Sequence, residues 1–131
     1  MLRIESPLSA DLEALVHRTI GCCITVHREL GPGLVEAVYQ RAVCIEIETA
    51  GISFECEKQC PILYRGKRIY SHRLDIVVSG QILLELKAVD RVHAVHRSQV
   101  LSCLRASKLR IGLLINFNVA VLPNGIHRIV L

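Results

Sequence analysis

The chain has 131 residues, and 51% of them are hydrophobic, which suits a domain with a sizeable core and argues against intrinsic disorder. No apolar run approaches the ~20 residues that a membrane-spanning helix needs, and the first residues, 1–7, lack the apolar centre of a signal peptide. We therefore expect a single domain over residues 1–131, in the cytoplasm and without membrane contact.

The net charge of +4 is unevenly distributed along the chain. Residues 1–57 hold four Lys/Arg and nine Asp/Glu, whereas residues 58–131 hold twelve Lys/Arg and three Asp/Glu. Those three acids are Asp75, Glu85 and Asp90. A basic surface around a few acids suits a polyanion whose phosphate meets a metal ion. Ordinary solvated basic faces are the alternative.

Six cysteines stand at positions 22, 23, 44, 56, 60 and 103. Without a signal peptide, we expect reduced thiols in the core rather than disulfides. No Cys-x-x-Cys pair occurs, so a zinc site is not expected. His93 and His96 can share a helix face, but a solvated or phosphate-facing pair is the favoured interpretation.

Two helices are predicted at the start of the chain. Ser6-Pro7 is typical of a helix start, and apolar residues then recur at three- and four-residue steps, which predicts an amphipathic helix from about residue 9 to 29. Gly31-Pro32-Gly33 ends it, because proline cannot continue a helix interior. A second helix is predicted over about residues 34–50, with Gly51 as its C-terminal cap.

Glu36 falls in the first turn of this second helix, where the helix dipole favours a carboxylate. A helix-end charge is therefore one interpretation of Glu36. Tyr39 lies on the same side of the helix. Its side chain either hydrogen-bonds into a site or packs in the core.

Extended segments dominate the middle of the chain. The runs 52–58 and 60–64 are strand-like, and Arg65-Gly66-Lys67 is typical of a turn. Residues 69–78 and 81–88 are predicted to form the central hairpin. The nearly continuous apolar run of its second strand indicates a strand covered on both faces.

A third helix is predicted over about residues 92–107, with Gln99 near its apolar stripe. Residues 111–117 form a buried strand. Residues 119–122 and 126–131 flank Pro123-Asn124-Gly125, a strong turn signal, and are predicted to form a closing hairpin. The order of elements predicts an α/β fold with a mixed sheet flanked by helices.

Three charged residues interrupt the apolar strands of the central hairpin. Glu85 and Lys87 are two apart, so they point to one face. A three-residue loop at Ser79–Gln81 sets Asp75 opposite Glu85, and a loop at Val78–Gly80 sets it opposite Leu83 on the same face. A two-residue loop reverses Asp75 to the other face. A shared site therefore requires a loop of odd length.

Asp75 followed by Glu85-Leu86-Lys87 resembles the Asp…Glu-x-Lys signature of the PD-(D/E)xK nuclease superfamily. Gly33-Leu-Val-Glu36-Ala-Val-Tyr39 is similar to a Gly-x-x-Glu-x-x-Tyr motif. Further matching stretches are His27–Gly33, Gln99 and Leu113-Leu-Ile-Asn-Phe117. Together they resemble the small GxxExxY branch of that superfamily over nearly the whole chain. This resemblance implies a restriction-endonuclease-like core of helix, three strands, helix and strand, here with an extra N-terminal helix and a C-terminal hairpin.

The resemblance also implies roles for individual residues. Mg²⁺ or Mn²⁺ would be held by Asp75, Glu85, the backbone carbonyl of Leu86 and, through water or at a second metal, Glu36. Lys87 would act on the attacking water, and Gln99 would complete the catalytic set. Five further side chains are candidates for phosphate contacts: His72, Arg73, His93, His96 and Arg97.

One position departs from the family pattern. Active relatives often carry Gln-x-x-x-Tyr on the third helix, but Gln99 is followed here by Cys103. The missing hydroxyl removes no metal ligand. It does remove a group with which this helix would position the substrate.

The function expected from these features is metal-dependent hydrolysis of phosphodiester bonds in nucleic acid, DNA rather than RNA. A non-catalytic module that binds nucleic acid or protein on a nuclease scaffold is the alternative. A homodimer would extend a small footprint, and the apolar terminal hairpin offers an interface for it.

Overall fold

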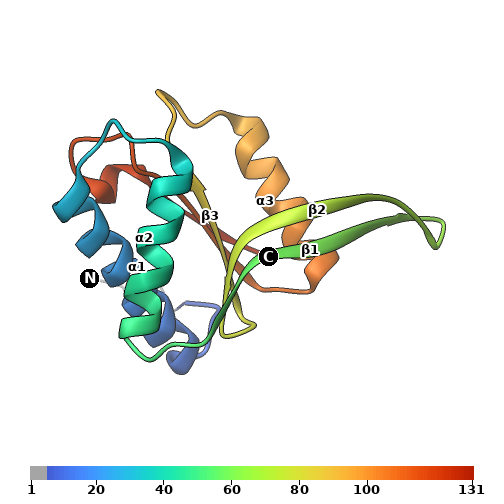
Figure 1. Ribbon diagram of the computed structural model, residues 1–131. Coiled ribbons are helices and arrows are strands. Elements are labelled where there is room, and N and C mark those ends of the chain that lie inside the picture. Colours follow the sequence, from blue (N-terminus) through green and yellow to red (C-terminus); the bar gives the residue numbers. More distant parts are fainter. Residues whose placement is uncertain (1–5) are drawn as a thin grey trace, which may run out of the picture.

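The computed structural model describes residues 6–131 and shows a five-stranded sheet between helices (Figure 1). In chain order the elements are α1 (Ala10–Leu30), α2 (Glu36–Thr49), β1 (Phe54–Tyr64), β2 (Lys67–Val78), β3 (Ile82–Lys87), α3 (Ala94–Ser107), β4 (Ile111–Asn116), the 3-10 helix η1 (Leu122–Gly125) and β5 (Ile126–Val130). The mixed α/β fold predicted from the sequence is confirmed. Most of the segment inspected for a signal peptide, residues 1–5, lies outside the described residues.

The strands follow the order β1-β2-β3-β4-β5 across the sheet. Only β3 and β4 run parallel, and α3 makes the crossover that a parallel pair requires. The remaining neighbours are antiparallel. Apart from the half-buried Lys87, every residue of β3 and β4 is buried, as expected for strands covered on both faces.

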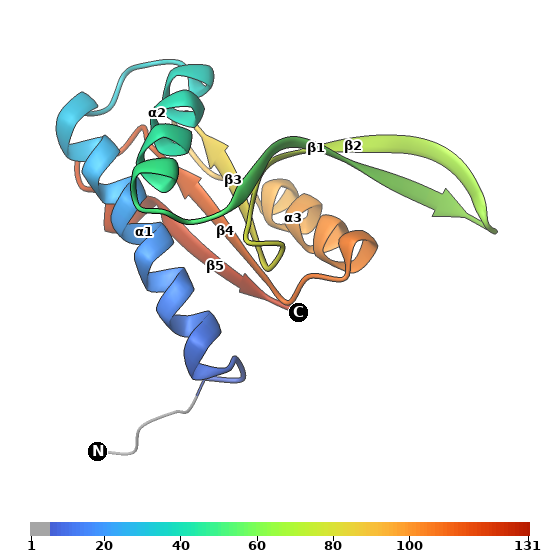
Figure 2. The same ribbon diagram turned by 60° about the horizontal axis from the view of Figure 1, so that its bottom comes forward.

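Helices α1 and α2 cover one face of the sheet, and α3 covers the other (Figure 2). Leu84 and Leu86 of β3 join the core under α1 and α2, whereas Leu83 joins the smaller core under α3. Because successive strand residues point to opposite faces, Glu85 and Lys87 share the face of Leu83. The two charged residues are therefore directed toward the side of α3.

Several predicted boundaries shift. Ser9, not Ser6, caps α1, because its side chain accepts a hydrogen bond from the Leu12 N–H at 3.1 Å. The runs 52–58 and 60–64 form the single strand β1, which starts at Phe54. This edge strand accommodates Pro61, as edge strands can. The third helix starts at Ala94, two residues later than predicted.

The predicted closing hairpin is wrong. Residues 119–122 form no strand, the turn Pro123–Gly125 lies in η1, and β5 pairs with β4 instead. The carbonyl of Val119 accepts a hydrogen bond from Nε2 of His27 at 2.8 Å, so it is engaged by α1 rather than by a neighbouring strand. The hairpin interface suggested for a homodimer therefore does not exist in this form.

The sheet divides at its centre. Strands β2 and β3 pair only from Ile76–Leu84 to Val78–Ile82, while β1 and β2 remain paired as far as Tyr64 and Lys67. Beyond the division, β1 and β2 leave the body together as a long hairpin (Figures 1 and 2). Asp75 and Glu85 are the next residues after the last β2–β3 pair, so they lie at the point of division.

Candidate active site

The loop between β2 and β3 has the odd length that a shared site requires. Val78 pairs with Ile82, so Ser79–Gln81 is a three-residue loop, closed by a 2.9 Å hydrogen bond from the Gln81 N–H to the Val78 carbonyl. Ser79 and Gly80 both have positive φ. The last β2–β3 pair is Ile76–Leu84, so the next residues of the two strands, Asp75 and Glu85, stand opposite each other. This is the arrangement predicted for a three-residue loop at Ser79–Gln81.

The carboxylates of Asp75 and Glu85 are bound to the backbone of the opposing strand. Asp75 Oδ2 accepts the Leu86 N–H at 2.9 Å, and Glu85 Oε1 accepts the Asp75 N–H at 3.2 Å. Both residues are buried, with 5% and 8% of their surfaces exposed. These bonds satisfy backbone groups where strand pairing has ended, and they fix both carboxylates in position.

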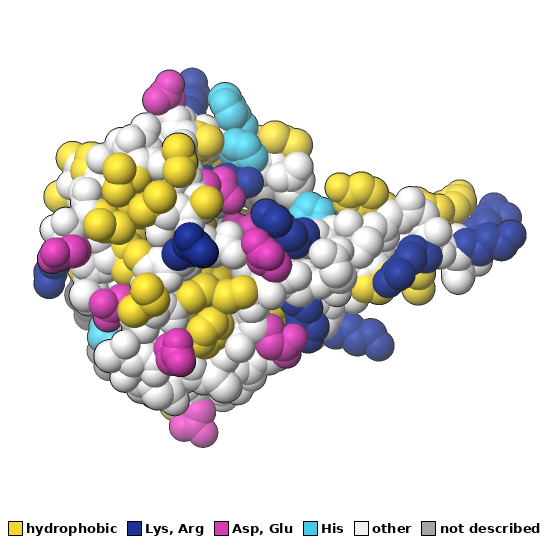
Figure 3. All heavy atoms as spheres, viewed as in Figure 1, with side chains coloured by type: hydrophobic (Ala, Val, Ile, Leu, Met, Phe, Trp, Pro, Cys, Tyr) yellow, Lys and Arg dark blue, Asp and Glu magenta, His cyan; other side chains and the backbone are white. Residues whose placement is uncertain are grey.

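A cavity of about 290 Å³ opens beside this pair. Its lining brings together side chains from α2, β2, β3 and α3: Glu36, His72, Arg73, Asp75, Glu85, Lys87, His96, Gln99, Val100 and Cys103. All five residues predicted as catalytic are in this set, together with three of the five predicted phosphate contacts. The space-filling view shows acidic and basic side chains clustered near the junction of the long hairpin with the body (Figure 3).

The site is electrostatically unfavourable for its own carboxylates. Burial, reinforced by the neighbouring charge of Asp75, raises the pKa of Glu85 from 4.5 to about 8. Burial and the Asp75 charge also raise the pKa of Glu36, although Lys87 and Arg73 oppose that shift. Three carboxyl groups thus share the cavity with two cations, Lys87 and Arg73, and the raised pKa values show that ionising all three is unfavourable. A bound cation would stabilise their ionised forms.

Glu36 is held at the cavity by the turn that precedes α2. The buried hydroxyl of Tyr39 donates to the carbonyl of Gly31 at 2.5 Å and accepts from the Leu34 N–H at 3.2 Å. The ring of Tyr39 stacks on Phe117, with centroids 4.6 Å apart. Tyr39 thus both packs and hydrogen-bonds, but its partners lie in the turn and the core rather than in the cavity. It fixes the start of the helix whose first residue is Glu36.

Two predicted phosphate contacts do not line the cavity. Arg97 donates to Nδ1 of His127 on β5, at 2.7 Å. The backbone N–H of His93 donates to Nδ1 of His96 at 3.0 Å, so this pair closes the first turn of α3. His96 reaches the cavity, while His93 ends the loop before the helix.

The sequence interpretation assigned no role to Asn116 at the end of β4. Its side chain accepts the Val89 N–H at 3.1 Å and donates to the Val89 carbonyl at 2.8 Å. These two hydrogen bonds to the Val89 backbone tie the segment after Lys87 to β4. A buried amide that ends an otherwise apolar strand was the available signal.

Cys103 occupies the position where the family pattern has tyrosine. It is buried, lines the cavity and packs under α3. Burial and the charge of Glu85 raise its pKa to about 12, so the thiol is protonated at neutral pH and is a poor nucleophile. This position contributes packing, and no hydroxyl is available to a substrate.

The donor set suits a hard divalent cation that retains water. Within residues 6–131, no cluster of three or more His, Cys, Asp or Glu side chains has the geometry of a ready-made metal cage. Mg²⁺ commonly takes only one or two carboxylates and keeps several waters. Two fixed, facing carboxylates in an open cavity therefore fit such an ion better than they fit zinc, which prefers four nitrogen or sulfur ligands.

A mixed sheet flanked by helices, with a buried Asp–Glu pair and a Lys at one cavity, is consistent with the restriction-endonuclease-like class of folds. In a scan of family models, the model of the PD-(D/E)XK nuclease superfamily matches residues 13–129, and the chain therefore belongs to that superfamily. Comparisons with curated proteins and with solved structures found no match. None of the helices within residues 6–131 is long and apolar enough to cross a membrane.

Proposed function

We propose that the protein is a metal-dependent nuclease that hydrolyses phosphodiester bonds of nucleic acid at this cavity. The observation that carries the proposal is the facing pair of buried carboxylates, Asp75 and Glu85, with Lys87 on the same cavity wall. Burying two carboxylates side by side costs stability. A catalytic use of their charge explains why the fold retains them.

Asp75, Glu85 and the backbone carbonyl of Leu86 would hold Mg²⁺ or Mn²⁺, and Glu36 would act through water or at a second metal. When bound, the ion supplies an activated water and offsets the charge on the leaving oxygen. The hydrogen bonds that fix Asp75 and Glu85 support this role, because they orient both carboxylates before any ion arrives.

The remaining cavity residues act on the substrate and the water. Lys87 orients the attacking water and stabilises the negative charge that develops on the phosphate. Gln99 hydrogen-bonds the substrate from α3. His72, Arg73 and His96 line the same cavity and contact the flanking phosphates. The phosphates are bound in the ground state and the transition state alike, so these contacts contribute affinity more than rate.

We assign the chain to the GxxExxY branch. The motif residues Gly33, Glu36 and Tyr39 support this assignment, because each has a separate place in one local structure. Gly33 adopts a φ of 98°, which favours glycine, and Tyr39 fixes the turn that delivers Glu36 to the cavity.

A non-catalytic binding module on the same scaffold is the second candidate. The observation that favours it is Cys103, which supplies no hydroxyl where active relatives carry tyrosine. In that case the basic residues around the cavity hold nucleic acid or an acidic protein partner, and no bond is broken.

The deciding experiment incubates the purified protein with labelled DNA and RNA in Mg²⁺, Mn²⁺ or EDTA. The nuclease proposal expects cleavage with metal, and none in EDTA or with the Lys87→Ala variant. Binding without cleavage under every metal condition establishes the second candidate. Absence of both binding and cleavage overturns the nuclease proposal and the nucleic-acid form of the second candidate.

A further inference from the structure

The long β1–β2 hairpin ends in a free arm, which we define as residues 61–70. Its two strands pair with each other, but β3 pairs only with Ile76–Val78 of β2. Within residues 61–70, no residue is buried, and Ile62 alone is half-buried. The arm therefore projects from the body without packing against it (Figures 1 and 2).

Four large apolar side chains of the arm are 59–65% exposed: Leu63, Tyr64, Ile69 and Tyr70. An isolated two-stranded hairpin is at best marginally stable in water. A concentration of exposed apolar side chains rimmed by charge marks an interaction site. Figure 3 shows hydrophobic side chains along the arm and Lys/Arg side chains at its far end.

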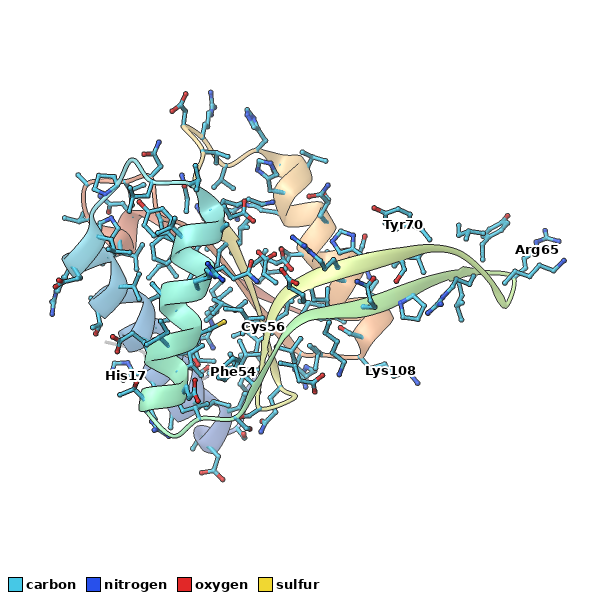
Figure 4. All side chains as sticks on the ribbon, in the orientation of Figure 1. His17, Phe54, Cys56, Arg65, Tyr70 and Lys108 are labelled. Atoms are coloured by element: carbon cyan, nitrogen blue, oxygen red, sulfur yellow. The ribbon has the colours of Figure 1, made fainter. Side chains whose placement is uncertain are left out.

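The charge of the arm selects a polyanion as its partner. Arg65, Lys67 and Arg68 stand at the tip, and no acidic residue occurs between 58 and 74. Within residues 6–131, none of these three cations forms a salt bridge. By contrast, Arg73 at the base pairs with Glu57 at 3.4 Å. The labelled view places Arg65 at the tip and Tyr70 on one side of the arm (Figure 4).

The arm is continuous with the candidate active site. His72 and Arg73 follow the arm on β2 and line the cavity that contains Asp75. From Asp75 to Lys67, β2 spans at most about 26 Å, which corresponds to roughly eight nucleotide steps of a duplex. A strand cut in the cavity would thus continue alongside the arm toward its tip.

We propose that the arm is a duplex-DNA grip, in which the β-ribbon enters the major groove beside the cut site. The inference rests on the proposed nuclease function and names its substrate class. A two-stranded ribbon fits the major groove of B-DNA, which is about 12 Å wide. The major groove of duplex RNA is too narrow for it. The tip cations contact phosphates, and the exposed apolar side chains contact base edges and thymine methyl groups.

The test compares Lys67→Ala/Arg68→Ala with a charge-matched control, Arg28→Ala/Arg105→Ala, which removes two exposed cations from helices. Binding of fluorescent duplex DNA, duplex RNA and single-stranded DNA is measured in EDTA. The arm variant should weaken duplex-DNA binding about tenfold or more and lower the salt slope by about two. The control and wild-type proteins should differ much less. Tyr64→Ser/Ile69→Ser should also weaken duplex-DNA binding.

Cleavage separates this proposal from the proposed function. At saturating protein with Mg²⁺, the Lys67→Ala/Arg68→Ala variant should cut at nearly the wild-type rate, since the arm contributes affinity. Unchanged Kd in this variant, with wild-type cleavage intact, overturns the grip alone. Arm-dependent duplex binding without cleavage under any metal overturns the nuclease proposal and leaves the grip standing.

Three further outcomes also overturn the grip. Equal losses for duplex RNA or single-stranded DNA exclude a major-groove contact. A dimer in wild-type protein that becomes a monomer in Tyr64→Ser/Ile69→Ser makes the arm an interface between copies. If an arm variant cleaves more slowly while its Kd for duplex DNA is unchanged, the arm supports the geometry of the cavity and does not bind DNA. Melting curves confirm that the compared variants are folded.

Discussion

Asp75 and Glu85 each complete the hydrogen bonding of the strand opposite. The Asp75 N–H donates to Glu85 Oε1 at 3.2 Å, and the Leu86 N–H donates to Asp75 Oδ2 at 2.9 Å. The two carboxylates therefore replace ladder bonds at the point where β2 and β3 separate. The same division of the sheet opens the cavity and fixes the residues that would use it.

The first prediction concerns the pH dependence of stability in EDTA. Burial and the Asp75 charge raise the pKa of Glu85 from 4.5 to about 8. Between these values the folded protein holds a proton that the unfolded chain has released, so this group lowers stability as the pH rises. The loss starts near pH 4.5 and is complete above about pH 8.

Melting curves of wild type and Glu85→Gln across this range test the prediction. The two proteins should be similar near pH 4.5, and the variant should be increasingly more stable toward pH 8. The comparison is needed because the lowered pKa values of His96 and His127 act in the opposite direction and are common to both proteins. A stability difference that does not vary with pH contradicts the assignment.

The second prediction concerns Asp75→Asn. The amide is nearly isosteric, and its oxygen can still accept the Leu86 N–H, so the melting temperature should change little. Cleavage should fall about 100-fold or more, because the charge that acts in the transition state is lost. Duplex binding should remain within a few-fold of wild type. A variant that still cuts at the wild-type rate removes Asp75 from the mechanism.

The third prediction separates the roles of Tyr39 and Glu36. Tyr39→Phe keeps the stacking on Phe117 but leaves the Gly31 carbonyl and Leu34 N–H without their partner. Stability should fall by about 1–3 kcal/mol, as for other buried hydrogen bonds. Cleavage should also fall, since the turn that delivers Glu36 is loosened.

Glu36→Gln is the matched comparison for this turn. It should reduce cleavage without reducing stability, because burial and the Asp75 charge both work against the ionised Glu36 side chain. Denaturant unfolding and cleavage rates are measured on both variants. Equal stability losses in both would show that Glu36 supports the fold instead of the chemistry.

The central hairpin was predictable because several local signals agree. The sequence has charged residues within apolar strands and a Ser-Gly-Gln loop between them. Because side chains alternate along a strand, only two loop placements set Asp75 on the same face as Glu85 and Lys87. The motif around Glu36 likewise lies within one helix and the turn before it. Gathering Glu36, Gln99 and the hairpin into one cavity, however, was expected from the family resemblance and not from local pattern.

The elements that were not predicted depend on distant partners. Residues 119–122 are apolar enough for a strand, yet Val119 is engaged by His27, 92 positions earlier in the chain. The single strand β1 was predicted as two runs that break at Gln59, and Pro61, inside the second run, is accommodated because β1 lies at an edge of the sheet. The projection of residues 61–70 also depends on where β3 stops pairing with β2.

The last prediction concerns the tight contact between Gly125 of η1 and Asn116 at the end of β4. A Cβ at Gly125 would lie 2.1 Å from the backbone oxygen of Asn116 and 3.2 Å from Cγ2 of Val119. Backbone must shift to accept it, so Gly125→Ala should lower stability by about 1–3 kcal/mol or more. Because the Asn116 side chain holds Val89, the shift should also reach Lys87 and lower cleavage.

Gly21→Ala is the control for this substitution. Gly21 lies inside α1, and a Cβ there meets no atom within 4 Å. Alanine should therefore raise stability by about 0.5–1 kcal/mol through its higher helix propensity, with cleavage unchanged. Denaturant unfolding of the two variants gives changes of opposite sign if the packing is as described. A Gly125→Ala protein as stable as wild type would mean that η1 does not pack against the end of β4. In that case η1 could not affect Lys87 through Asn116 and Val89.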